Sequence, residues 1–365
     1  MTAAHKSSQR VALLYTAALL LLGTGLPRAS LAQGPPQRAD LCQPLSFGSL
    51  NGHEGVFYPA ATVARFNPRN PQEVALLICE VNNGKMRGLV DTDTLRCHLY
   101  VLNRASGRRH LLVRDVGCEL SWGRNGFIAY ATPGGELWVV RADGSGRRRF
   151  TTAGSRFATW SPDGTRLVCL PGNPTEYRKL TICILTAEGQ LVRQHEILEA
   201  DPASNLAWAP DGKSIVFAGM PDPQGLGPVN AYSYRLAENR LRRLGELAER
   251  RVFGSLVVTP DNTLLWATLA RGLERVDRRT GRLRQVWHVG QLMSTDLSGD
   301  GRQLLSVDAV GGAYSSVPAG SSRKMLNQKV LYLTTDVGVS KLDGKNYKAI
   351  LKLPEKVEVP NPGGG

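Results

Sequence analysis

The segment that most constrains the fold is FATWSPDGTRLVCL, from Phe157 to Leu170, because its turn chemistry recurs along the chain. Ser161, Pro162 and Gly164 are residue types favoured at the first, second and fourth positions of a type I turn. The residues on both sides are rich in apolar, β-branched and aromatic side chains, which favour strands over helices. The segment therefore predicts two antiparallel strands joined by a tight turn.

Related hairpins recur before and after this segment, at residues 63–79, 119–132, 205–219, 256–269 and 294–307. Each unit also contains a second turn, usually closed by glycine, as in RADGSG (Arg141–Gly146) and KLDG (Lys341–Gly344). Each unit therefore has four strands, with an inner hairpin carrying the first turn and an outer hairpin carrying the second. A spacing of roughly 40 to 50 residues between successive units is typical of propeller blades or a similar array.

We therefore expect an all-β protein, a six-bladed β-propeller of four-stranded antiparallel blades over residues 51–353. The Gly-, Ser- and Ala-rich stretch 311–328 leaves a seventh blade open as an alternative. We also expect residues 53–61 to supply a strand that completes the last blade and closes the ring. In a closed ring every blade buries its faces against two neighbours and few long edges are exposed.

Residues 1–32 have the features of a secretory signal peptide. His5, Lys6 and Arg10 give a positive start, residues 11–26 an apolar core, and Ser-Leu-Ala before residue 33 a cleavage site. The core is shorter than the roughly 20 residues of a membrane span. We therefore expect a cleaved leader, no integral membrane span, and a periplasmic or secreted mature protein.

The segments that flank the propeller are rich in Pro and Gly. We expect residues 33–50 to form a flexible lead and residues 354–365 to form a disordered tail.

Two of the repeats carry a family resemblance. WSPDGTRLVCL and WAPDGKSIVFA, together with the outer pattern LWVVRADGSGRRRFT, resemble the repeats of the TolB-like β-propeller family. The resemblance covers residues 51–353 and is strongest in these two units. It implies a six-bladed propeller in the cell envelope that serves as a docking platform, here without the α/β domain that precedes the propeller in TolB.

Basic residues gather beside the outer turns. Loss of Lys6, Arg10 and Arg28 with the leader lowers the formal net charge from +14 to +11. Equivalent residues of a propeller lie on one face, so these arginines predict a cationic outer ring: Arg108, Arg109, Arg147, Arg148, Arg149, Arg242, Arg243, Arg278, Arg279 and Arg282. Such a ring attracts anionic partners. The alternative is that the charges protect outer strand edges from pairing with other chains.

Polar residues at the starts of inner strands are candidates for a small axial funnel: Glu119, Arg156, Asn205 and Asp296. The alternative is a solvated rim. His98, His110 and His195 fall on third or outermost strands, which argues against a histidine metal centre at the axis. The sequence contains no G-x-S-x-G or H-E-x-x-H motif, so we assign no catalytic residue, metal or cofactor.

Two further repeat positions have both a functional and a structural interpretation. The turn aspartates Asp163, Asp211, Asp261 and Asp300 would form a ring of cation ligands, or would bond their own turns, which we favour. Trp122, Trp160 and Trp208 would form a stacking platform or, as we favour, pack between blades.

Six cysteines remain after removal of the leader, and disulfides are common in exported proteins. Cys79 and Cys97 are expected on the second and third strands of the first blade, and Cys169 and Cys183 on the same strands of the third. We predict these two pairs as disulfides, and Cys42 with Cys118 as a third.

We favour a non-enzymatic platform that acts as a monomer and binds an envelope protein or an anionic envelope polymer, and not nucleic acid. The alternative is a sugar- or lactone-active propeller enzyme that uses axial carboxylates.

Overall fold

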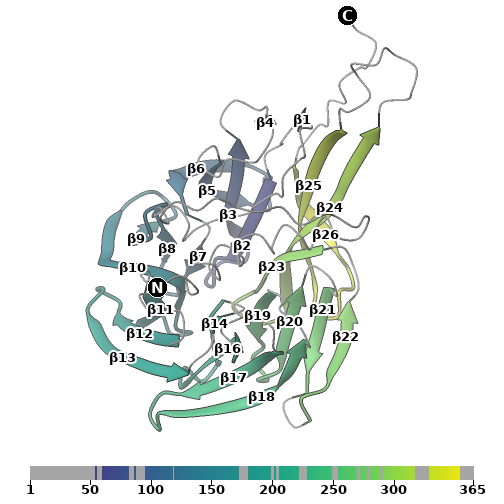
Figure 1. Cartoon of the computed structure of the whole chain (residues 1–365). Helices are drawn as coiled ribbons and strands as arrows, with labels where there is room; N and C mark the ends of the chain where they lie inside the picture. The colour runs from purple at the N-terminus through teal and green to yellow at the C-terminus, as the bar shows by residue number, and fades with distance from the viewer. Residues whose placement is uncertain are drawn as a thin grey trace, which may run out of the picture.

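The computed structural model is a six-bladed β-propeller (Figure 1). It describes residues 54–55, 60–81, 86–87, 95–117, 119–171, 180–198, 201–202, 205–221, 228–248, 254–268, 272–277, 280–287, 291–316 and 329–353. Over these ranges the regular structure is β throughout. Within them, no helix is long and apolar enough to cross a membrane.

The first three blades use strands in chain order. Blade 1 contains β2 (Ala60–Phe66), β3 (Glu73–Val81), β5 (Leu95–Asn103) and β6 (Arg109–Val116). Blade 2 contains β7 (Leu120–Trp122), β8 (Phe127–Ala131), β9 (Glu136–Arg141) and the first half of β10 (Arg148–Trp160). Blade 3 contains the second half of β10, β11 (Arg166–Pro171), β12 (Leu180–Thr186) and β13 (Leu191–Leu198).

The last three blades follow the same order. Blade 4 contains β14 (Asp201–Pro202), β15 (Ala207–Trp208), β16 (Ser214–Met220), β17 (Val229–Arg235) and β18 (Arg240–Ala248). Blade 5 contains β19 (Gly254–Val258), β20 (Leu264–Thr268), β21 (Gly272–Val276) and β22 (Leu283–Trp287). Blade 6 contains β23 (Gln291–Leu297), β24 (Gln303–Ser316), β25 (Lys329–Lys341) and β26 (Lys348–Leu353). The short strands β1 (Glu54–Gly55) and β4 (Met86–Arg87) pair with each other.

The expectation that residues 53–61 complete the last blade is wrong. β2 is the innermost strand of blade 1, and blade 6 takes all four of its strands from residues 291–353. Part of the Gly- and Ser-rich stretch extends β24, which pairs with β25 as one long hairpin. Because blade 6 already has its outer strand, β26, the ring closes through side-chain contacts between the first and last blades.

Blades 2 and 3 share a strand. β10 is 13 residues long, and its first half pairs with β9 while its second half pairs with β11. The register of its pairing shifts between Arg149 and Gly154 and again between Arg156 and Thr159. Phe157, in the second shift, has a positive φ of 54°, a conformation uncommon for residues other than glycine. The chain therefore passes from blade 2 to blade 3 without a loop.

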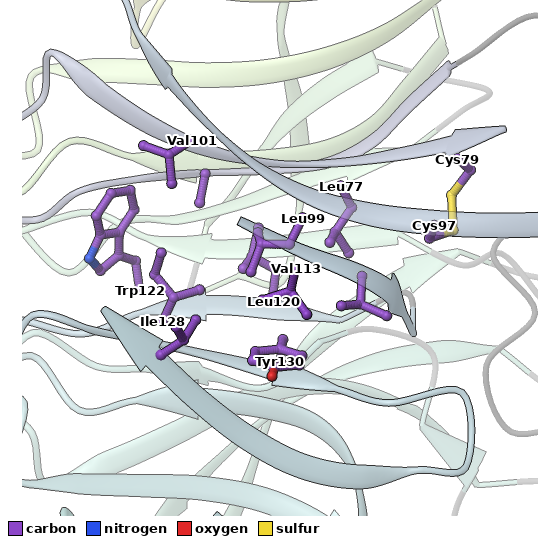
Figure 2. Packing of buried hydrophobic residues seen from close by; sticks show 13 residues of the cluster. Leu77, Cys79, Cys97, Leu99, Val101, Val113, Leu120, Trp122, Ile128 and Tyr130 are labelled. Carbon is purple, nitrogen blue, oxygen red and sulfur yellow. A yellow bond between two sulfur atoms is a disulfide. The ribbon is translucent and has the colours of Figure 1, made fainter. Parts of the chain in front are cut away.

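The hydrophobic core lies between adjacent blades. One cluster joins blades 1 and 2 and includes Leu77, Leu99, Leu120 and Tyr130, as Figure 2 shows. Trp122, Trp160 and Trp208 are at most 7% exposed, which confirms that the repeated tryptophans pack in the core. The predicted disulfide between Cys79 and Cys97 is present at the edge of the first cluster.

The turn aspartates bond their own turns, as expected. Asp163 accepts hydrogen bonds from the hydroxyl of Ser161 at 2.5 Å and from the backbone N–H of Thr165 at 3.0 Å. Asp300 repeats this arrangement with Ser298. These bonds stabilise the charged carboxylate and lower the pKa of both aspartates, the hydroxyl bond being the largest cause. The residues therefore specify turn geometry.

Candidate functional site

Side chains on the inner strands bond the backbone of the next blade around the axis. The N–H of Ala158 in blade 3 donates to Glu119 Oε2 of blade 2 at 3.4 Å. The N–H of Leu256 in blade 5 donates to Asn205 Oδ1 of blade 4 at 2.8 Å, and Asn205 Nδ2 donates back to the Leu256 carbonyl at 2.9 Å. These residues therefore hold neighbouring blades in register.

The residues of these axial junctions share one repeat position. Glu119, Asn205 and Ser255 each lie three residues before the last residue of their inner-strand segment. Ser255 accepts from the N–H of Thr295 in blade 6 at 3.4 Å. The pattern is visible in the sequence as ELSW, NLAW and SLVV, each with a polar residue first. Sequence reasoning named Glu119 and Asn205 as axial candidates but missed Ser255, and it did not recognise that these residues join blades.

Arg65 on β2 joins blade 1 to both of its neighbours. Its Nε donates to the Leu120 carbonyl of blade 2 at 3.1 Å. Its Nη1 donates to Ser294 Oγ of blade 6 at 2.8 Å and lies 3.3 Å from the Thr295 carbonyl. Sequence reasoning missed Arg65, since a single arginine on a strand gives no local signal of such contacts.

Asp296 completes the junction between blades 6 and 1. Its Oδ2 accepts the backbone N–H of Phe66 at 2.8 Å. Burial raises the pKa of Asp296, an effect opposed by the charge of Arg65. Burial likewise lowers the pKa of Arg65, against the attraction of Asp296 and Glu119. The seam between the two ends of the ring thus contains two half-buried groups of opposite charge.

Three of the four predicted funnel residues, Glu119, Asn205 and Asp296, therefore lie at axial junctions. The fourth, Arg156, pairs through its backbone with Leu170, and its side chain lies outside the described part of the structure. His98, His110 and His195 lie on β5, β6 and β13, which confirms their predicted distance from the inner strands. Within the described residues, no three His, Cys, Asp or Glu side chains gather as a metal site.

The outer rim has junctions of its own. Arg148 donates through Nη2 and Nη1 to the carbonyls of Ala187 and Glu188, at 3.2 and 3.3 Å, in the outer turn of blade 3. Arg193 of blade 3 donates to the Leu236 carbonyl of blade 4 at 2.9 Å. An arginine of one outer strand thus binds the outer turn of the following blade, so part of the basic rim joins blades together.

The structure divides the predicted cationic ring. Besides Arg148, three members are engaged inside their own blades: Arg147 with the Tyr130 hydroxyl at 2.9 Å, Arg149 with Glu136 at 3.3 Å, and Arg243 with Asn230 at 2.8 Å. The other described members are also exposed: Arg108, Arg109, Arg242 and Arg282. Arg278 and Arg279 lie outside the described residues.

A group of arginines on blades 4 and 5 faces solvent, and we call it the rim patch: Arg240, Arg242, Arg275, Arg282 and Arg284. Arg275 is the direct cross-strand partner of Arg284, an arrangement of like charges that is destabilising. In the described part of the chain, Arg240, Arg242, Arg282 and Arg284 have no carboxylate partner. Sequence reasoning missed Arg275 and Arg284, because strand register is needed to place one opposite the other.

The two blades that carry the rim patch meet closely. A Cβ built on Gly245 of β18 would lie 2.5 Å from the Cα of Gly281, which precedes β22. Only a residue without a side chain permits this approach. The contact places Arg282 beside the outer strand of blade 4. The register of β21 puts Arg275 and Arg284 on the face of blade 5 that carries Leu265.

No protein-family model and no curated protein matches the sequence. Among solved structures, a putative TolB from Agrobacterium tumefaciens is similar with a TM-score of 0.51 and 17% identity, over 71% of this chain and 89% of that one. The chain has a TolB-like β-propeller fold. TolB from Acinetobacter baumannii matches this TolB-like propeller with a TM-score of 0.43 and 15% identity, over 70% of this chain and 65% of that one. The propeller domain of a Pyrococcus furiosus protease matches with a TM-score of 0.47 and 12% identity, over 80% and 96%.

A buried carboxyl group that sequence reasoning missed lies in blade 6 of the TolB-like propeller. Asp308 on β24 is 2% exposed and accepts hydrogen bonds from the hydroxyls of Ser306 at 3.0 Å and Tyr347 at 3.3 Å. Its other oxygen is buried without a partner in the described structure. Burial raises the pKa of Asp308 to about 6, and the charge of Asp336, its cross-strand partner, adds to the rise.

The Asp308→Asn variant is expected to gain stability relative to the native protein as the pH rises. Because the folded-state pKa is about 6 and the unfolded one about 3.8, folding takes up a proton in this window, and native stability falls as the pH rises through it. Asparagine does not titrate, so the difference in unfolding free energy should change by about 2 kcal/mol between about pH 4 and 6. Urea unfolding at the two pH values measures it.

Asp300 provides a control of opposite sign. Its pKa is lowered in the folded state, so its contribution to stability is lost as the pH falls. The Asp300→Asn variant should therefore be less stable than the native protein at neutral pH, and this difference in unfolding free energy should shrink as the pH falls. A difference between Asp308→Asn and native protein that does not vary with pH would contradict the assignment of Asp308.

Proposed function

We propose that this TolB-like propeller is an exported, non-enzymatic platform that binds an acidic surface of a partner protein through the rim patch. The leader-like residues 1–32 and the Cys79–Cys97 disulfide support export, because disulfides persist in oxidising compartments. The observation that carries the proposal is the set of exposed arginines on blades 4 and 5.

The rim patch has the chemistry of a docking surface. Arg275 and Arg284 lie directly opposite each other, and the described structure holds no carboxylate against Arg284. Such an arrangement costs stability in the free protein, and a carboxylate from a partner would relieve the repulsion. Arginine binds carboxylates through a planar pair of N–H groups and is enriched at protein interfaces.

The axial residues support a binding role over the enzymatic alternative. A sugar- or lactone-active propeller would need carboxylates on the inner strands that are available to a substrate. Glu119 and Asp296 instead accept backbone N–H groups of the following blade. Their oxygens contribute to the junctions between blades, and a substrate would have to compete with those bonds.

Reversal of the patch charges tests the proposal. We expect the Arg240→Glu/Arg284→Glu variant to bind its partner with an association rate lowered about ten-fold or more, because charge complementarity accelerates encounter. The native interaction should weaken as salt rises, whereas the variant should be less sensitive to salt. Crosslinking in intact cells identifies the partner, and association kinetics of the purified pair measure the effect.

The matched control is Arg108→Glu/Arg114→Glu. These arginines are exposed on blade 1, across the ring from blade 4, and the change in net charge is identical. The control should keep the native partner and association rate. Equal losses of association rate in both variants would mean that net charge alone attracts the partner. If the patch variant crosslinks to the same partner at the native rate, the rim patch is not the binding surface.

A further inference from the structure

Two cysteines of blade 3 face each other across neighbouring strands. Cys169 on β11 is the direct cross-strand partner of Cys183 on β12, in a stretch of unbroken register. The prediction of a disulfide between them is wrong for this structure, where both residues are free thiols. Their side chains are nonetheless close enough to hydrogen-bond.

The equivalent pair of cysteines in blade 1 forms a disulfide. Cys79 and Cys97 are also direct partners on the second and third strands of their blade, and they form a disulfide. The two pairs lie on either side of blade 2: Cys79 and Cys97 belong to the core shared with it from blade 1, and Cys169 and Cys183 to the core shared from blade 3. Blade 1 thus shows that this pairing of strands accommodates the bond.

The two thiols of blade 3 differ in character. Cys169 is 4% exposed, while Cys183 is partly exposed. The hydrogen bond between the thiols raises the pKa of Cys169 and lowers the pKa of Cys183, and burial adds to the rise for Cys169. A thiol with a lower pKa and access to solvent is the better nucleophile near neutral pH.

We propose that Cys183 and Cys169 form a dithiol that exchanges reversibly with external disulfides, Cys183 acting as the attacking thiol and Cys169 as the resolving thiol. This site is separate from the rim patch and does not depend on the proposed binding function. Its substrate class is a disulfide on a small molecule or on another protein.

The exchange proceeds in two steps through a mixed disulfide. The thiolate of Cys183 attacks one sulfur of the external disulfide, forms a bond to it and releases the other sulfur as a thiolate. Cys169 then loses its proton and attacks the Cys183 sulfur, which releases the second external thiolate. The two cysteines are oxidised by two electrons in total, and the external disulfide is reduced to two thiols that take up the two protons.

Exchange with glutathione disulfide tests the proposal on the full chain. Protein treated with mild reductant should present Cys169 and Cys183 to an alkylating reagent. After glutathione disulfide is added, mass spectrometry of native protein should show the loss of both thiols and no lasting adduct. The Cys169→Ser variant should instead keep one glutathione on Cys183, because the resolving thiol is absent.

The Cys183→Ser variant is the matched comparison. Its remaining thiol, Cys169, should react with glutathione disulfide about ten-fold or more slowly than Cys183 does in Cys169→Ser, with a pH profile displaced to higher pH. Equal rates in the two single variants, a stable adduct on native protein, or two thiols that persist in native protein would each overturn the proposal. A Cys169–Cys183 bond that resists reductant in the folded protein would also overturn it, since the pair would then be a fixed structural bridge.

Discussion

Replacement of Arg65 by methionine is expected to lower the free energy of unfolding by about 2–4 kcal/mol, because it removes hydrogen bonds from a charged donor, each of which contributes about 1.5–3 kcal/mol. The guanidinium of Arg65 bonds the Leu120 carbonyl of blade 2 and Ser294 of blade 6. Its loss leaves those groups without their donor and removes the positive charge that favours the ionised form of Asp296. Urea unfolding followed by tryptophan fluorescence measures the change.

Arg69→Met is the control for this prediction. Arg69 is exposed in the first turn of the same blade, so its replacement should change stability by no more than about 0.5 kcal/mol. The Asp296→Asn change should cost less in the Arg65→Met background than in the native protein, because the two groups interact. A loss below about 1 kcal/mol for Arg65→Met would contradict the role of Arg65 in joining the blades.

Gly189→Ala is expected to destabilise the protein by about 2–5 kcal/mol, the sum of a left-handed backbone cost and an overpacking cost. Gly189 has a φ of 95°, and a Cβ at this position would lie 2.2 Å from the carbonyl oxygen of Phe150. That oxygen belongs to the backbone of β10 and cannot turn aside as a flexible side chain would. The outer turn of blade 3 should therefore lift away from blade 2.

Gly126→Ala separates the two contributions. Gly126 has a similar φ of 86°, but a Cβ there meets no atom within 4 Å. It should show only the backbone cost of about 1–2 kcal/mol. Thermal and urea unfolding of both variants provide the comparison, and equal losses would show that the close approach of Gly189 to Phe150 contributes nothing.

The blades could be predicted from the sequence because their turns are local. Ser161, Pro162 and Gly164 specify a turn within a few residues of one another, and the same chemistry recurs at each unit. The Cys79–Cys97 disulfide could be predicted because it needs only the order of strands within one blade. The inner-strand positions of Glu119, Asn205 and Asp296 followed from the same repeat.

The contacts between blades could not be predicted in this way, because they join residues far apart in the chain. Arg65 meets Ser294 only when the ring is closed, and no neighbouring residue of Arg65 signals that contact. The pairing of Arg275 with Arg284 depends on a register that shifts at Leu273 and Glu274. Closure of the ring could not be predicted for the same reason. Residues 53–61 were expected to add a strand to the last blade, but blade 6 takes all four of its strands from residues 291–353.

The continuity of β10 has a consequence for where the ring can be opened by circular permutation. New termini between β18 and β19 would fall between two strands of different blades and sever no paired strand. New termini near Ser155 would cut a strand that is paired on both halves, with β9 and with β11. Blades 2 and 3 are therefore joined by one uninterrupted strand, and the new termini of a permutant that folds must lie outside β10.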